Sequence, residues 1–195
     1  MTDARNVRLV LMSCCAPCSA GAIKQLADGE IPGISDFIVL FFNPNIFPAD
    51  EYDRRLAEQI KYCNSLGVKY AIGEYDHNAW RCAVRGMESE PERGARCSAC
   101  FQFRFDYARR WAAEHGYDAV ASVFGVSRHK DQSQVDMAGI TALGDKYMPI
   151  KWDEKLRQKI GHESNFYRQN YCGCEFSMRP QQKNDNTMIK IIPIR

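Results

Sequence analysis

Two adjacent cysteines near the N-terminus are the first residues whose spacing could do chemistry. Cys14 and Cys15 follow a short apolar run, and Pro17 stands where a helix would begin. A disulfide between adjacent cysteines is badly strained, because the intervening peptide bond keeps the two sulfurs from the geometry they need. Both thiols can, however, turn toward a metal. The pair therefore predicts half of a metal or cluster site.

A second pair, Cys97 and Cys100, has the C-x-x-C spacing at the start of a predicted helix. The helix dipole and Arg96 should favour the thiolate form there, which is the form that binds metals. Together with Cys14 and Cys15, these thiolates suit a structural zinc ion or an iron–sulfur cluster. Adjacent cysteines fit a small tetrahedral ion less easily than a larger cluster. The spacing therefore favours a cluster, with zinc and a purely redox role as the alternatives.

A C-x-C motif near the C-terminus consists of Cys172 and Cys174 with Gly173 between them. A disulfide in so tight a ring is strained and easily reduced, which suits an electron relay better than a structural link. Two further metal ligands or a plain turn are the alternatives. Cys18 lies about one helical turn beyond the first pair and could back that site. The remaining two cysteines, Cys63 and Cys82, are expected to be packing residues rather than ligands.

Polar residues that follow the fourth predicted strand form another candidate group. His129 and Lys130 stand in the sequence SRHKD, where they could meet a phosphate or a substrate hydroxyl. The alternative is a plain loop into a helix, with Asp131 as the helix cap. Residues 167–170 (YRQN) precede the C-x-C motif and could bind an RNA phosphate or a base edge.

Length and composition limit the class of protein. The chain has 195 residues, which suits one domain, and 45% hydrophobic residues, which is enough for a core. The sequence has no long uncharged apolar run, so no membrane span is expected. The charged N-terminus also lacks a signal-type apolar block. We therefore expect a cytoplasmic protein. In that compartment the nine cysteines should serve metal binding or redox chemistry rather than structural disulfides.

Charge is distributed unevenly along the chain, although the net charge is only +2. Residues 1–144 carry 16 Lys and Arg against 18 Asp and Glu, whereas residues 145–195 carry 10 against 6. A basic C-terminal quarter is compatible with an anionic partner such as RNA. A solvated surface with chance asymmetry explains the same numbers.

The elements that must position these residues alternate between strand and helix. Such alternation predicts a three-layer α/β fold, in which a parallel sheet has helices on both faces and ligands bind at the carboxyl ends of the strands. We expect one catalytic domain over residues 1–178 and a tail over residues 179–195, whose apolar end could dock as an edge strand. The expected strands are Val7–Met12, Asp36–Phe42, Val68–Tyr75, Ala119–Gly125 and Lys146–Trp152. The expected helices are Ala16–Ala27, Glu51–Leu66, His77–Met87, Ser98–His115, Ser133–Leu143, Glu154–Ile160 and Glu163–Asn170.

Five strings in order, from Leu9 to Met178, resemble the QueH-type epoxyqueuosine reductases. They are MSCCAPCS, FFNPNIFPADEYDRR, ESEPERGARCSACFQFR, VSRHK and YRQNYCGCEFS. The resemblance implies an adenine-nucleotide-α-hydrolase-like (HUP-type) fold. It also implies an oxidoreductase that reduces epoxyqueuosine to queuosine at the wobble position of the tRNA anticodon, the final step of queuosine biosynthesis. Its partners would be tRNA bearing epoxyqueuosine and an unidentified electron donor.

The same resemblance assigns roles to the cysteines. It implies a [4Fe–4S] cluster held by Cys14, Cys15, Cys97 and Cys100, and a redox-active dithiol formed by Cys172 and Cys174. A second, mononuclear iron is associated with the family. Residues considered as its ligands are Asp76, Glu90 and Asp131, of which Glu90 and Asp131 could equally cap neighbouring backbone.

The sequence departs from the family pattern at four positions. Met12 stands where the family often has histidine, Arg93 where it has the first of two glycines, and Arg128 where it usually has proline. Phe176 replaces a common tyrosine. These changes affect loop shape and hydrogen bonding around the cysteines, and leave the cysteine framework intact.

Two other functions fit part of the pattern. An iron–sulfur tRNA thiolation enzyme would need a glycine-rich ATP loop after the first strand, where this chain has CCAPC. A zinc-stabilised RNA-binding module would use the cysteines without catalysis. For the reductase, we expect the dithiol and the cluster to deliver two electrons, and His129 or Lys130 to supply a proton.

Overall fold

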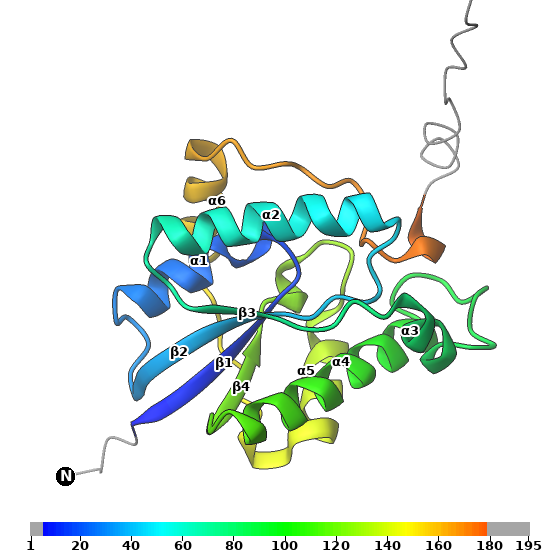
Figure 1. Cartoon of the computed structure of the whole chain (residues 1–195), viewed down its shortest axis with the longest axis horizontal. Helices are drawn as coiled ribbons and strands as arrows, with labels where there is room; N and C mark the ends of the chain where they lie inside the picture. The colour runs from blue at the N-terminus through cyan, green and yellow to red at the C-terminus, as the bar shows by residue number, and fades with distance from the viewer. Residues whose placement is uncertain (1–5, 179–195) are drawn as a thin grey trace, which may run out of the picture.

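The computed structural model describes residues 6–178, which form a parallel sheet between two layers of helices (Figure 1). The predicted tail, residues 179–195, and its docking as an edge strand lie outside these residues. The strands are β1 (Val7–Ser13), β2 (Ile34–Phe41), β3 (Tyr70–Ile72) and β4 (Ala119–Ser122), in the order β3-β2-β1-β4 across the sheet. The helices are α1 (Ala16–Ala27), α2 (Ala49–Ser65), α3 (His77–Ala83), α4 (Ala95–Glu114), α5 (Gln132–Leu143) and α6 (Glu154–Glu163).

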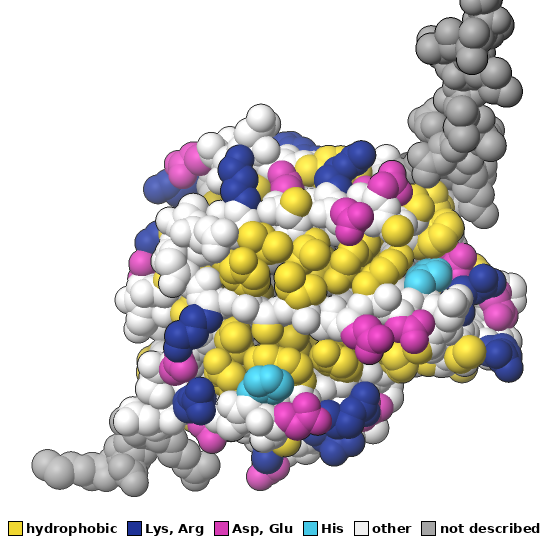
Figure 2. Space-filling view, in the orientation of Figure 1, with side chains coloured by type: hydrophobic (Ala, Val, Ile, Leu, Met, Phe, Trp, Pro, Cys, Tyr) yellow, Lys and Arg dark blue, Asp and Glu magenta, His cyan; other side chains and the backbone are white. Residues whose placement is uncertain are grey.

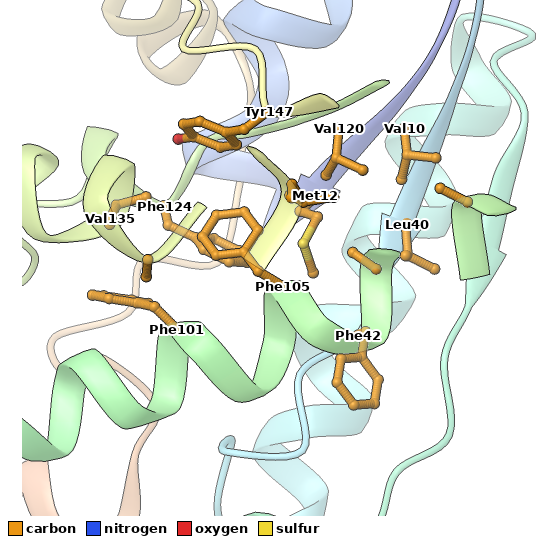
Figure 3. Close-up of a cluster of buried hydrophobic side chains, with 14 of the residues drawn as sticks. Val10, Met12, Leu40, Phe42, Phe101, Phe105, Val120, Phe124, Val135 and Tyr147 are labelled. Carbon is orange, nitrogen blue, oxygen red and sulfur yellow. The ribbon is translucent and has the colours of Figure 1, made fainter. Parts of the chain in front are cut away.

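The central strand β1 is buried on both of its faces. Val10 and Met12 point into the core that α4 and α5 cover, where Phe105 packs near them (Figure 3). Leu9 and Leu11 belong to the opposite core, beneath α1 and α2. Successive residues of a strand face opposite sides of the sheet, so a strand covered by helices on both faces is apolar throughout. The predicted α/β class with helices on both faces is confirmed.

The fifth predicted strand, Lys146–Trp152, does not form. A short 3-10 turn occupies residues 144–146, and a single isolated bridge joins Tyr147 to Val120. The backbone N–H of Met148 donates to the carbonyl of Val120 at 2.9 Å, but the next residue is Pro149. Proline has no N–H to donate, so it cannot extend a ladder of hydrogen bonds.

The last predicted helix, Glu163–Asn170, is also wrong. Helix α6 ends at Glu163, and the chain beyond it runs without helical turns beside α2. The backbone N–H of Tyr167 donates to Glu58 Oε1 at 2.8 Å, and its hydroxyl donates to Glu51 Oε2 at 2.9 Å. These bonds to α2 hold the segment in place of the local bonds of a helix.

The surface around the edge strand β3 is apolar. Figure 2 shows hydrophobic side chains gathered on this face between α2 and α4, and Ile72 of β3 is 49% exposed. Among residues 6–178, none of the helices has the length and apolar character needed to cross a membrane.

Arg93 is the one non-glycine residue in the described part of the chain with a left-handed backbone, at φ = 68°. This conformation explains why glycine suits the position, because a Cβ atom costs about 1–2 kcal/mol there. The Arg93 side chain donates to the carbonyl of Arg128 at 2.7 Å, and any truncation removes that bond.

Comparing two truncations isolates the backbone strain at this position. Arg93→Gly and Arg93→Ala lose the same hydrogen bond, but only alanine keeps the strained Cβ. We expect the glycine variant to have the larger free energy of unfolding, by about 1 kcal/mol, in urea titrations of both proteins. Equal stabilities, or a more stable alanine variant, would show that the loop does not hold Arg93 under strain.

Candidate metal centre

A first group of thiols lies where β1 passes into α1. Cys14 and Cys15 are buried, and their Sγ atoms are 4.0 Å apart. Cys15 is the extended N-cap of α1, so the helix that starts after it brings Cys18 back over the same point. The Sγ atoms of all three cysteines lie within 4.8 Å of one another. The structure therefore adds Cys18 to the predicted pair.

A second group of thiols surrounds a small inner cavity of about 20 Å³. Its walls carry Cys97 and Cys100 from α4, together with Cys172 and Cys174 of the C-x-C motif. Lys130 lies on the same wall. Cys172 and Lys130 also line a larger cleft of about 1010 Å³ that contains the first group of thiols. The two groups, which come from three distant parts of the sequence, therefore meet around Cys172 and Lys130.

Hydrogen bonds from Arg55 of α2 hold the C-x-C motif in this position. Arg55, which is almost fully buried, forms an ion pair with Glu51 at 2.7 Å. The Arg55 guanidinium also donates to the carbonyl oxygen of Cys172 at 3.1 Å and to that of Tyr171 at 3.4 Å. A backbone bond from Phe47 to the carbonyl of Gly173, at 2.8 Å, ties the motif to the loop after β2.

Gly173 leaves no room for a side chain. Its φ is +104°, and a Cβ atom there would lie 2.8 Å from Arg55 Nη1. We expect Gly173→Ala to lower the free energy of unfolding by about 1–3 kcal/mol, because strain and overlap add at one position. Urea unfolding measures this effect.

Gly161→Ala is the matched control for this prediction. Gly161 lies in α6 with open space around its Cα, and alanine favours a helix over glycine by about 0.5–1 kcal/mol. That variant should be at least as stable as the unmodified protein. If Gly173→Ala also left stability unchanged, the close fit of Arg55 against the motif would be wrong.

Three buried cations lie among the thiols without a carboxylate partner in the described part of the chain: Arg96, whose side chain is bonded to backbone carbonyls, and Lys130 and Arg104. Lys130 is 7% exposed and Arg104 is fully buried. Neither belongs to an ion pair among the described residues. Lys130 Nζ is 3.8 Å from Cys14 Sγ, and Arg104 Nη1 is buried with no hydrogen-bond partner. Buried charges are costly unless an opposite charge compensates them, so this arrangement calls for an anionic group.

The pKa values of the thiols follow from these surroundings. Hydrogen bonds from the Cys15 and Cys18 thiols, and the charge of Lys130, hold the pKa of Cys14 well below its usual range. Burial opposes the charge of Lys130, but the thiolates of Cys14, Cys172 and Cys18 together outweigh it and raise the Lys130 pKa. The first group of thiols is thus arranged to present a thiolate.

Burial outweighs the effect of Arg96 on the second group of thiols. It is the main effect on Cys97 and Cys100, and it raises the pKa of both thiols. The charge of Arg96 acts against burial at Cys97, as the sequence suggested, but is the weaker effect. The Arg96 side chain also donates to the carbonyls of Met87, at 3.3 Å, and Glu88, at 2.9 Å. Arg96 therefore mainly shapes the loop before α4.

The donor set fits a thiolate-bound metal centre. Four thiolates around zinc or around an oxidised [4Fe–4S] core leave about two net negative charges, which Lys130 and Arg104 can balance. The three thiols of the first group and the four of the second exceed the ligands that a single zinc ion needs. Thiols beyond a set of four fit a cluster together with a separate dithiol.

The three acidic residues considered as ligands of a second iron each accept a backbone N–H at the start of a helix. Asp76 Oδ1 accepts from the Ala79 N–H at 2.9 Å, and Asp131 Oδ1 accepts from the Gln134 N–H at 3.0 Å. Glu90 Oε2 accepts from the N–H of Ala95, at 3.1 Å, at the start of α4. All three carboxylates are therefore hydrogen-bonded to backbone N–H groups.

The two candidates for proton transfer lie at different depths. Lys130 is on the wall shared by the cleft and the inner cavity. His129 lines the cleft alone, with its Nδ1 3.5 Å from Glu92 Oε2. Lys130 is the candidate next to the thiols.

Sequence reasoning did not identify Arg104 or Arg55 as part of the site. A signal for Arg104 was present, because Cys97, Cys100 and Arg104 recur at i, i+3 and i+7 and so share one face of α4. Arg55 carries no such signal. Its role depends on the C-x-C motif more than a hundred residues away.

Known proteins resemble this chain over most of its length. The family model described as epoxyqueuosine reductase QueH matches residues 9–180. The protein of that name from Haemophilus influenzae is 38% identical over 191 residues, which cover 94% of this chain and 76% of that protein. The one from Histophilus somni is 38% identical over 90% of this chain and 74% of its own, and the one from Thermotoga maritima is 28% identical over 85% and 87%. These matches confirm the resemblance carried by the five motifs.

A solved structure supports the fold. The U34-tRNA thiolase NcsA from Methanococcus maripaludis, determined with its [4Fe–4S] cluster, superposes with a TM-score of 0.50 over 90% of this chain and 62% of that chain. At 15% sequence identity, this likeness concerns the fold alone. It agrees with the expected α/β fold.

Proposed function

The chain belongs to the epoxyqueuosine reductase QueH family, and we propose that it reduces epoxyqueuosine to queuosine at the wobble position of a tRNA anticodon. The observation that carries the proposal is the convergence of two thiol groups on Lys130 at the carboxyl end of the sheet. The cleft beside them opens onto Cys14, Cys15 and Cys172.

The reaction requires two electrons and two protons. Reduction of the epoxide gives an alkene and water, and oxidation of the Cys172–Cys174 dithiol to a disulfide releases the two electrons and two protons that balance it. Both thiols are free in the structure. Lys130, whose charged form the neighbouring thiolates favour, would donate a proton toward the departing oxygen, and His129 is the alternative donor from the cleft wall.

The cofactor that we propose is a [4Fe–4S] cluster held by Cys14, Cys15, Cys97 and Cys100. When bound, it would supply one-electron transfer from an external donor, which is needed to return the disulfide to the dithiol. For a second iron, Cys18 is the nearby thiol without an assigned role. The guanidinium of Arg104 would be a positive counter-charge beside the centre, and Arg55 would keep Cys172 in place.

We place this reaction in the cytoplasm. All nine cysteines are free in the structure, and a reducing compartment keeps thiols in that form.

Anaerobic reconstitution followed by nucleoside mass spectrometry tests the proposal. The purified protein should be brown, contain iron and sulfide, and convert epoxyqueuosine in tRNA to queuosine when a reductant is present. A colourless protein that contains zinc and leaves the base unchanged would support the RNA-binding module instead. Thiolated tRNA in the presence of ATP would support a thiolation enzyme.

A further inference from the structure

Three exposed cations, besides the buried Lys130, stand around the cleft without carboxylate partners. Arg128 comes from the loop after β4, Lys151 from the segment before α6, and Arg168 from the segment before the C-x-C motif. All three side chains are exposed and line the cleft. Within the described residues, no carboxylate lies within 4.0 Å of any of them. We call this set the cationic rim.

Acidic residues of the same cleft are engaged elsewhere. Asp153 Oδ1 accepts the backbone N–H of Leu156 at 3.0 Å, as the cap of α6. Glu154 pairs with Arg157 at 3.2 Å. The third acid, Asp136, accepts from the side chains of Tyr147, at 2.7 Å, and Gln132, at 2.8 Å. The rim therefore keeps its positive charge for a ligand.

Two aromatic side chains accompany the rim. Trp152 and Phe166 are half-buried and line the cleft. The Trp152 indole donates to the carbonyl of Ser122 at 2.9 Å, and Phe166 meets the ring of Tyr62 edge-on at 5.5 Å. Cations that follow a groove, together with fixed aromatic rings, are the usual features of single-stranded nucleic-acid sites, where phosphates meet the cations and bases stack on the rings.

We propose that the cationic rim binds the phosphates of a single-stranded RNA loop on either side of the nucleotide that enters the cleft. This inference rests on the proposed function, because the loop would be that of the anticodon. At about 1010 Å³, the cleft is at the upper end of the range for small-ligand sites, so it can hold a base together with parts of its neighbours. Trp152 and Phe166 would stack on those neighbouring bases.

Salt dependence of RNA binding tests the rim. The probe is a fluorescent anticodon stem-loop with unmodified guanine at the wobble position, titrated with the full chain at several KCl concentrations. Each of Arg128→Gln, Lys151→Gln and Arg168→Gln should reduce the slope of log K against log[KCl] by about 0.7, and the triple variant by about 2. Lys61→Gln, on an exposed position of α2 outside the cleft lining, is the matched control and should not change the slope.

Several outcomes would overturn the inference. These are a triple variant with the original slope, weaker binding with an unchanged slope, or an equal change in the Lys61→Gln control. Circular dichroism of each variant establishes that it is folded before binding is measured.

A parallel assay separates this inference from the proposed function. The unmodified protein is incubated with epoxyqueuosine-containing tRNA, and its nucleosides are analysed. If the unmodified protein reduces the base but the rim variants keep the original salt slope, the proposed function stands and the proposed RNA-binding role of the cationic rim is wrong. If the rim variants have reduced salt slopes but the unmodified protein does not convert the base, the proposed function is wrong and the cationic rim remains an RNA-binding site.

Discussion

Cys172→Ser should abolish reduction of epoxyqueuosine while leaving the iron and sulfide content of the reconstituted protein unchanged. Cys172 lines both the cleft and the inner cavity, so it is the thiol of the C-x-C motif that faces the substrate site. Serine cannot form the disulfide that releases the electron pair, and we expect a loss of at least about 10³-fold in turnover. Nucleoside mass spectrometry measures the product, and iron and sulfide analysis reports the centre.

A single-turnover experiment makes this prediction sharper. The reduced protein, freed of excess reductant, should convert up to one equivalent of substrate, and the Cys172→Ser variant should convert none. Cys82→Ser is the matched control, since Cys82 lies outside the lining of both cavities and is exposed, which corrects the packing role expected from the sequence. Undiminished single turnover would rule out the dithiol as the electron store, and loss of iron would make Cys172 a ligand.

Lys130→Met should change stability differently with and without the metal centre. In the metal-free protein the ammonium is buried beside the Cys14 thiol, which can take up a proton when the ammonium is removed, so replacing Lys130 with an apolar side chain should change the free energy of unfolding little. In the loaded protein the same change removes a buried counter-charge beside Cys14 and should cost about 3–5 kcal/mol. Urea unfolding under anaerobic conditions, with and without reconstitution, measures both values.

The same variant should lower the reduction potential of the loaded protein. A nearby positive charge stabilises the more negative, reduced state, so its removal disfavours reduction. A spectroscopic redox titration reports this shift. Lys24→Met is the control, because Lys24 forms only an exposed pair with Asp28 and should have little effect on either property. An equal loss of stability in the metal-free and loaded proteins would reduce Lys130 to a packing role.

Sequence patterns predicted the parts of the fold that depend on local order. Helix α1 begins and ends at the residues expected, because Pro17 suits its first turn and the chain past Ala27 leads to Gly29 at φ = 71°. The apolar run of β1 predicted a strand buried on both faces. In contrast, Lys146–Trp152 and Glu163–Asn170 carry the composition of a strand and a helix, but a proline and contacts with α2 decided their structure.

The sequence by itself determined the family, the parallel α/β class and the cysteines available for chemistry, because motif order, residue spacing and strand alternation are local properties of the chain. Only the tertiary structure decided which side chains surround those cysteines. It brought Cys18 to the first pair and placed Lys130 3.8 Å from Cys14. It also buried Arg104 without a carboxylate partner. The physical reason is that charge compensation and burial depend on contacts between distant segments, which residue spacing along the chain does not encode.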